Sequence, residues 1–98
     1  MYYQSMVIRN IGGSCGVYLP AKWGLKKGDW VHVEMVVAGK IYHHTTTVGF
    51  NDSAYIRIPK FWGLSKGDIV DTRINLSAVP EAYRKQNADS GTENKEGN

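Results

Sequence analysis

The sequence contains very little cysteine and no long apolar runs. Cys15 is the only cysteine, so an intrachain disulfide is excluded, and a chain without disulfides suits a reducing compartment. No apolar stretch approaches the ~20 residues that a helix needs to cross a bilayer. The first residues also lack the basic start and the apolar run of a secretion signal. We therefore expect a cytoplasmic protein without a membrane partner.

Catalytic and metal-binding patterns are also scarce. Residues 12–16 spell Gly-x-Ser-x-Gly, but a nucleophile elbow needs a turn from a strand into a helix, and here a strand is expected to follow. His43 and His44 are adjacent in an expected strand and face opposite sides, while His32 belongs to another strand. A zinc site needs three or four converging ligands. We therefore expect no enzyme activity, no metal site and no cofactor.

Glycine and positive charge are the features that the chain does have. Eleven glycines favour tight turns and short strands over long helices. Residues 1–74 carry nine Lys and Arg against five Asp and Glu, a balance of +4, whereas residues 75–98 carry three against four. The basic part is therefore the patterned part of the chain. Mild basicity is compatible with a nucleic-acid partner, although many other proteins share it.

The sequence repeats itself at a spacing of 39 residues. Residues 20–31 fall on residues 59–70, and Pro, Trp, Gly, Leu, Lys, Gly, Asp and Val recur in place. The match needs no gap, so Arg9 is expected to fall on Val48. A repeat of this kind indicates two copies of one structural unit.

The repeat predicts one domain followed by a polar tail. The two copies span about residues 5–37 and 41–75 within a domain of residues 1–76. Residues 77–98 lose the pattern, and the last dozen residues cannot bury apolar surface. We expect this tail to be largely disordered, with a short helix at residues 78–85.

Both copies have the same expected order of elements. Alternating apolar residues at 17–19 and 56–58 indicate strands with one buried face. Pro20 and Pro59 end these strands, and a short helical turn follows each of them. The other expectations are helical turns at 21–23 and 60–62, glycine stops at Gly24 and Gly63, turns braced by Asp29 and Asp68, strands at 30–37, 41–48 and 69–74, a hairpin turn at 38–40, and core positions at Trp23, Leu25, Trp62 and Leu64.

The order strand, Pro, short helix, Gly-Leu-x-Lys-Gly-Asp, strand resembles the AbrB/SpoVT/MazE family of swapped-hairpin proteins. The motif occupies residues 17–20 and 24–31, and again residues 56–59 and 63–70. The resemblance implies a mostly β fold, in which two units interlace their hairpins into a small β-barrel with short helical turns. Here one chain supplies both units, as a pseudodimer. The sequence departs from the family in having only three residues between Pro and Gly-Leu, which shortens the helical turn.

The resemblance also implies a function, which is binding of double-stranded DNA as a transcription regulator. Members of the family bind DNA through loops and basic residues near the first strand and the short helix. The DNA-binding residues expected here are the basic Arg9, Lys22, Arg57 and Lys60, the loop residues Asn10, Ser14, Asn51 and Ser53, and Tyr18, which alternation turns outward.

Other interpretations of the same residues stay open at this point. The basic side chains are equally compatible with solvated surface positions, and the loop residues with ordinary turn chemistry. An antitoxin-like protein that binds a partner protein as well as its promoter is the alternative function. Two pseudodimers could also pair into a homodimer.

Overall fold

The computed structural model describes residues 2–76 and 79, which form the mostly β architecture that the sequence predicts. The expected helix at 78–85 and the rest of the predicted tail lie outside the described residues, apart from Val79. Neither helical turn in the described part has the length or the apolar character of a membrane-spanning helix. The elements in chain order are β1 (Tyr2–Val7), β2 (Arg9–Ile11), β3 (Ser14–Tyr18), η1 (Ala21–Trp23), β4 (Trp30–Val37), β5 (Lys40–Thr47), β6 (Gly49–Phe50), β7 (Ala54–Arg57), η2 (Lys60–Trp62) and β8 (Ile69–Asn75).

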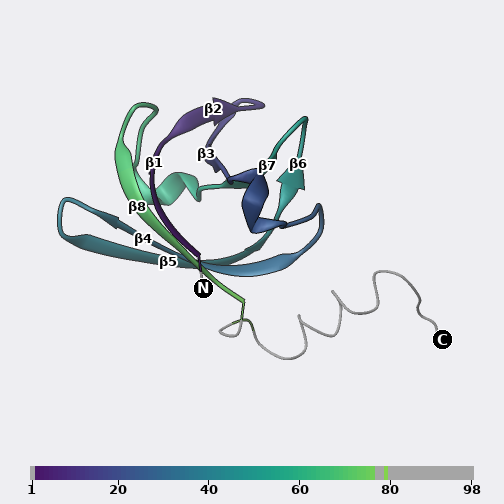
Figure 1. The fold of residues 1–98 in the computed structure, drawn as a ribbon. Coiled ribbons are helices and arrows are strands. Elements are labelled where there is room, and N and C mark those ends of the chain that lie inside the picture. The colour runs from purple at the N-terminus through teal and green to yellow at the C-terminus, as the bar shows by residue number, and fades with distance from the viewer. Residues whose placement is uncertain (1, 77–78, 80–98) are drawn as a thin grey trace.

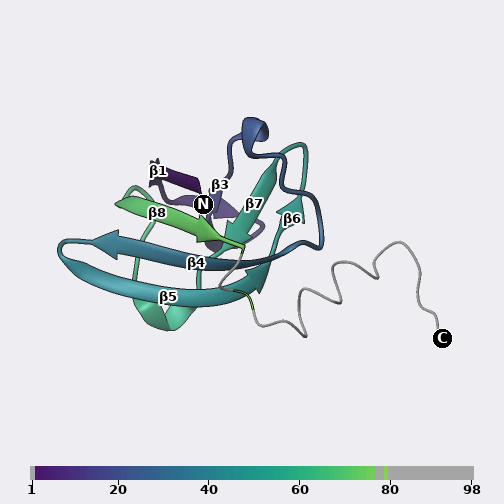
Figure 2. The ribbon, with the colours of Figure 1, turned by 60° about the horizontal axis from the view of Figure 1, so that its bottom comes forward.

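The strands form two antiparallel sheets of four strands each. The first sheet has the order β1-β8-β4-β5, and the second has the order β2-β3-β7-β6. In Figure 1 the first sheet makes the left and lower sides of the domain, and the second sheet makes the upper right. The long β4–β5 hairpin extends well beyond the second sheet (Figure 2). Each sheet keeps two edge strands, so the hydrogen bonding of the described residues does not close the expected barrel.

Strands from the two copies of the repeat are intermixed. In the first sheet the order is first copy, second copy, first copy, second copy, because β8 pairs with both β1 and β4, and β4 also pairs with β5. In the second sheet each copy supplies two neighbouring strands, and the copies meet at the β3–β7 pair. Neither sheet is therefore the product of one copy alone.

A single buried residue carries each copy from the first sheet to the second. Ile8 joins β1 to β2, and Val48 joins β5 to β6. The backbone of each of these residues is bonded to the Gly-Asp turn of the other copy. The bonds are Ile8 N–H to Asp68 O (2.9 Å), Gly67 N–H to Ile8 O (2.9 Å), Val48 N–H to Asp29 O (2.8 Å) and Gly28 N–H to Val48 O (2.8 Å). Each copy therefore holds the sheet crossing of the other in place.

This equivalence corrects the predicted alignment of the two copies. Ile8 and Val48 occupy the same structural position, so Arg9 corresponds to Gly49 and not to Val48. The gap-free match was wrong in this region, because the β6–β7 hairpin is one residue shorter than the β2–β3 hairpin. The match without a gap holds from β3 and β7 onward.

The local turn chemistry follows the prediction. Each helical turn is a single 3-10 turn that ends at a glycine in the left-handed region, with φ of 68° at Gly24 and 72° at Gly63. In the turns that follow, the carboxylates of Asp29 and Asp68 each accept a hydrogen bond of 2.8 Å from the backbone N–H three residues earlier. These bonds brace both turns as expected.

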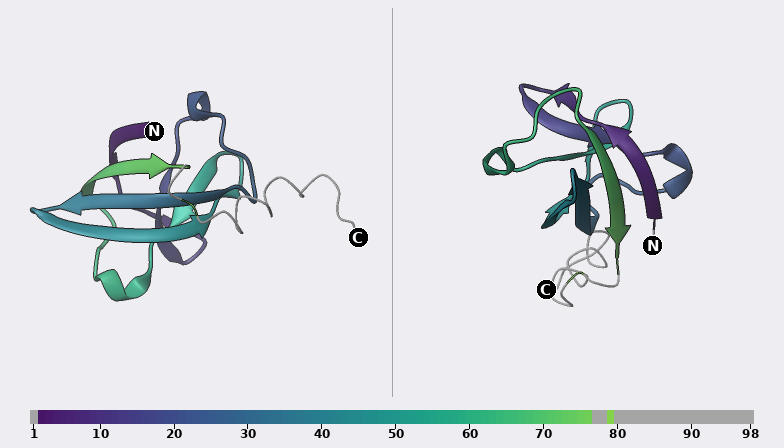
Figure 3. Two further views of the ribbon diagram at one scale, coloured as in Figure 1. Left: turned by 90° about the horizontal axis from the view of Figure 1, so that it is seen from below. Right: turned by 90° about the vertical axis from the view of Figure 1, so that its left-hand side faces the viewer.

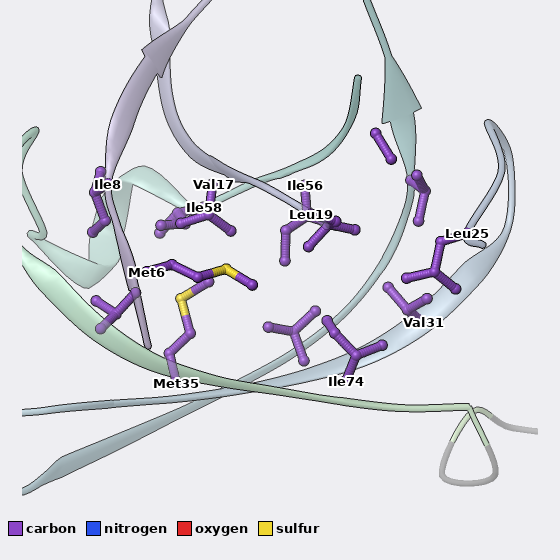
Figure 4. Close-up of a cluster of buried hydrophobic side chains, with 14 of the residues drawn as sticks. Met6, Ile8, Val17, Leu19, Leu25, Val31, Met35, Ile56, Ile58 and Ile74 are labelled. Atoms are coloured by element: carbon purple, nitrogen blue, oxygen red, sulfur yellow. The ribbon is translucent and has the colours of Figure 1, made fainter. Parts of the chain in front are cut away.

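The core lies between the two sheets and receives matching residues from both copies. Figure 4 shows Val17 and Leu19 from β3 and its end, with Ile56 and Ile58 from the corresponding segment of the second copy. Of the predicted core positions, three are buried and one is partly buried: Trp23, Leu25 and Trp62 are buried, and Leu64 packs against the cluster from its margin.

Thr72 is an exception within this apolar core. It is fully buried in β8, and its hydroxyl oxygen has no hydrogen-bond partner among the described residues. The corresponding position of the first copy is Val33, which is equally buried. The hydroxyl of Thr72 has therefore lost its contact with water without a replacement.

We expect the substitution Thr72→Val to raise the free energy of unfolding by about 1–3 kcal/mol, because it removes an unpaired polar group and keeps the shape of the side chain. The opposite substitution at the equivalent position of the first copy, Val33→Thr, should lower the free energy of unfolding by a similar amount. Urea unfolding followed by tryptophan fluorescence measures both. Equal stability of Thr72→Val and the wild type would show that the hydroxyl is satisfied.

Candidate nucleic-acid interface

The outward side of the second sheet brings together several of the predicted basic and polar residues. Val17 and Ile56 face the core, so the residues next to them in β3 and β7 face outward. On the same outward side, Arg9, Gly16 and Arg57 stand opposite one another across β2, β3 and β7. We call this surface the outer face, made up of Arg9, Ser14, Tyr18, Tyr55 and Arg57.

Three side chains of the outer face are in contact. The guanidinium carbon of Arg57 lies 5.2 Å from the centre of the Tyr55 ring. The Tyr55 ring meets the Tyr18 ring edge to face, with 6.3 Å between their centroids. A cation over an aromatic ring is held in place without losing its charge. Tyr55 was not among the predicted site residues, although alternation from Arg57 places it on the same face.

Glycines make room for these side chains. Gly12 and Gly13 form the two-residue β2–β3 turn with φ of 58° and 86°, which is typical of a type I′ hairpin turn. A Cβ atom on Gly12 would stand 3.0 Å from Nη2 of Arg57, so the guanidinium reaches as far as this turn. A Cβ atom on Gly49 would overlap the Tyr55 ring.

Within the part of the chain that the structure describes, no carboxylate pairs with the arginines of the outer face. Among the described residues, the ion pair found is that of Arg73 with Glu34 on the first sheet, at 3.7 Å. Arg9 and Arg57 are both exposed, and neither pairs with a carboxylate in this part of the chain. Unpaired arginines beside tyrosines and a hydroxyl can bind a phosphate backbone.

The predicted loop residues lie at two opposite corners of the second sheet. Because β3 and β7 are antiparallel, the β2–β3 turn lies beside the end of β7, and the β6–β7 turn lies beside the end of β3. Asn10 lies in β2 and Ser14 begins β3, so both are strand residues and not the loop residues that were predicted. Ser14 is on the outer face, whereas Asn10 points to the other side of β2 from Arg9. Asn51 and Ser53 are exposed in the β6–β7 turn, where the Asn51 N–H donates to the Ser53 carbonyl at 3.2 Å.

The two predicted lysines do not lie together. Figure 3 shows η1 and η2 on opposite sides of the domain. Lys60 lies with Ser14 and Arg57 around a pocket, whereas Lys22 is exposed on η1. At the position on η2 that corresponds to Lys22 stands Phe61, whose side chain is 87% exposed. The two sides of the domain therefore differ in their chemistry.

The histidines lie on the first sheet, away from the outer face. His32 and His43 stack with 5.6 Å between their ring centroids, a pairing that the sequence did not predict. His44 packs edge-on against Trp62, at 5.8 Å. Burial of His44 lowers its pKa from the ordinary value of 6.5, and the charge of His32 lowers that pKa further. Within residues 2–76 and 79, no three His, Cys, Asp or Glu side chains are grouped so that they could hold a metal ion.

Comparisons of the chain with protein-family models, with curated proteins and with solved structures find no match. The candidate interface therefore rests on its own geometry and charge.

We expect Gly16→Ala to lower the free energy of unfolding by about 1–3 kcal/mol, because overpacking a close contact costs that much. The added Cβ would stand 2.5 Å from the Ile56 carbonyl oxygen, which is backbone and cannot move freely. Gly49→Ala is the comparison, because the nearest atoms to its added Cβ belong to the Tyr55 side chain, which can shift more readily than backbone. Thermal unfolding compares the two variants, and equal losses would contradict this account of Gly16.

The lowered pKa of His44 predicts a loss of stability in mild acid. Between the unfolded value of 6.5 and the lower folded value, the unfolded chain binds the proton and the folded chain does not. Stability is therefore complete above pH 6.5 and falls as the pH drops towards the folded pKa. His44→Gln should flatten the plot of unfolding free energy against pH in this range, and His43→Gln is the control. A plot that stays as steep in His44→Gln would contradict the prediction.

Proposed function

We propose that this protein is a non-enzymatic transcription regulator that binds double-stranded DNA through the outer face of its second sheet. The observation that carries the proposal is a group of two arginines, two tyrosines and a serine on the outward side of the second sheet, where neither arginine pairs with a carboxylate of the described residues. The balance of +4 over residues 1–74 supports the same partner. The proposal includes the AbrB-like resemblance, in which two swapped-hairpin units form one pseudodimer.

The outer face lies on a sheet that is wider than a two-stranded ribbon. Its centre is the β3–β7 pair, flanked by β2 and β6, and neighbouring strands lie about 5 Å apart. The major groove is roughly 12 Å wide and admits a two-stranded ribbon, so the four-stranded face meets the phosphates that border a groove. In this arrangement Arg9 and Arg57 contact phosphates, and Tyr18 and Tyr55 lie beside them, one row further along β3 and β7.

The unequal halves of the outer face bear on the DNA sequence that it binds. Across the two copies, Arg57 corresponds to Tyr18, and Arg9 corresponds to Gly49. The two sides of the face therefore present different groups to the duplex. We expect a target site that is not a perfect palindrome, because equal half-sites would meet unequal surfaces.

We expect the protein to bind labelled duplexes, including the DNA upstream of its own gene, with an affinity that falls as salt rises. Arg9→Gln and Arg57→Gln should each weaken binding and reduce the slope of log K against log [salt] by about 1, because each removes one phosphate contact. Fluorescence anisotropy across a salt series measures both quantities.

The matched control for this experiment is Lys40→Gln. It removes the same charge from the β4–β5 hairpin of the first sheet, away from the outer face. This variant should bind the duplex with nearly the affinity of the wild type, apart from the small loss that any decrease in net positive charge causes. Absence of duplex binding at low ionic strength, or equal losses in all three variants, would overturn the proposed interface.

A further inference from the structure

A pocket of about 270 Å³ opens where the β2–β3 turn faces the chain that leaves β7. One wall is the start of β3, and the other is the segment that leads from Arg57 into η2. The Ile58 N–H donates to the Cys15 carbonyl at 2.9 Å and joins the two walls. The pocket is therefore built between the two copies, at one corner of the second sheet.

The groups that line the pocket suit an anion attached to a carbon skeleton. Arg57 and Lys60 supply two positive charges, and Ser14 supplies a hydroxyl. No Asp or Glu is among the lining residues. The remaining surface is largely apolar and comes from Ile58, Pro59 and Leu64. Two basic residues in one lining that has no carboxylate favour an anionic ligand such as a phosphate group.

The position of Arg57 is set by its surroundings before any ligand arrives. Its guanidinium lies over the Tyr55 ring and reaches the turn at Gly12, where a side chain would crowd Nη2. A side chain already held in place loses little conformational freedom on binding. Because the fold already orders the guanidinium, binding a ligand costs little additional side-chain conformational entropy.

The corresponding corner of the first copy lacks both charges. Tyr18 stands where the second copy has Arg57, and Ala21 stands where it has Lys60. In addition, Asp52 corresponds to Gly13 in the turn that faces this corner. The repeat thus offers an internal comparison, in which the positions of Arg57 and Lys60 carry uncharged residues at the other corner.

We propose that this pocket binds a phosphate group, supplied either by the DNA backbone or by a small phosphorylated ligand. The first source rests on the proposed function, and the second is independent of it. In both cases Arg57 and Lys60 contact the phosphate oxygens, Ser14 donates its hydroxyl, and the apolar wall packs against the carbon skeleton.

Cys15 makes the proposal testable in the intact chain. It lines the pocket, it is half-buried, and it is the only cysteine of the sequence. Its alkylation by iodoacetamide, followed by mass spectrometry, therefore reports on this one place. The probes are inorganic phosphate and a short duplex, each compared with chloride at the same ionic strength.

A bound phosphate should slow the alkylation of Cys15 several-fold. Arg57→Gln and Lys60→Gln should each weaken the protection by about tenfold or more in phosphate concentration, since a charge-assisted hydrogen bond contributes about 1.5–3 kcal/mol. Lys60 is exposed on η2, so its variant is expected to fold even if replacing Arg57 disturbs the sheet. Lys40→Gln should leave the protection unchanged.

The outcomes separate the pocket from the proposed function. Protection by phosphate alone supports the pocket with a small ligand, and protection by the duplex that is lost in Lys60→Gln supports it with a DNA phosphate. If the duplex binds by anisotropy while Cys15 reacts at the same rate throughout, the pocket is overturned and DNA binding stands. If phosphate protects Cys15 but no duplex binds, the pocket stands and the proposed function fails.

Discussion

The structure depends on four backbone hydrogen bonds that tie the sheet crossings at Ile8 and Val48 to the Gly-Asp turns. Both residues are buried, and each stands alone between a strand of the first sheet and a strand of the second. A buried N–H or C=O must find a partner, and at both crossings the turn of the other copy supplies it. A unit of about 40 residues buries too little surface to be stable alone. The reciprocal bonds let two such units share one core.

The outer face, like the sheet crossings, is built from both copies. The copies meet in the second sheet at the β3–β7 pair, which sets Arg57 of the second copy beside Gly16 of the first. From there the guanidinium reaches the turn at Gly12, which also belongs to the first copy. The interface and the pocket that we propose therefore belong to neither copy alone, and either would be lost if the copies separated.

The two copies carry apolar residues at most matching core positions, with Thr72 as an exception, and different residues at the outer face. Val17 matches Ile56 in the packed interior, where volume and apolar character are constrained by close packing. At the outer face, Tyr18 corresponds to Arg57, because an exposed position can change its charge at little cost in stability. An approximately symmetric backbone thus carries an asymmetric distribution of charge.

Local features were determined by the sequence itself. The prolines, the left-handed glycines, the braced Gly-Asp turns and the outward direction of Tyr18 and Arg57 follow from backbone geometry and from the two-residue period of a strand. Their causes lie within a few residues along the chain, so they are visible without a fold. Strand β1 was missed because its six residues lack a regular apolar alternation, and β8 of the other copy is what holds it in the sheet.

Only the tertiary structure decided which residues become neighbours. The two separate sheets, the one-residue offset that aligns Ile8 with Val48, and the stacking of His32 on His43 all depend on long-range strand register. The same register brings Lys60 and Arg57 to Ser14 and leaves Lys22 on the opposite side of the domain. A register is set by the packing of the whole core, because shifting a strand by one residue exchanges its two faces. No local pattern in the sequence contains that information.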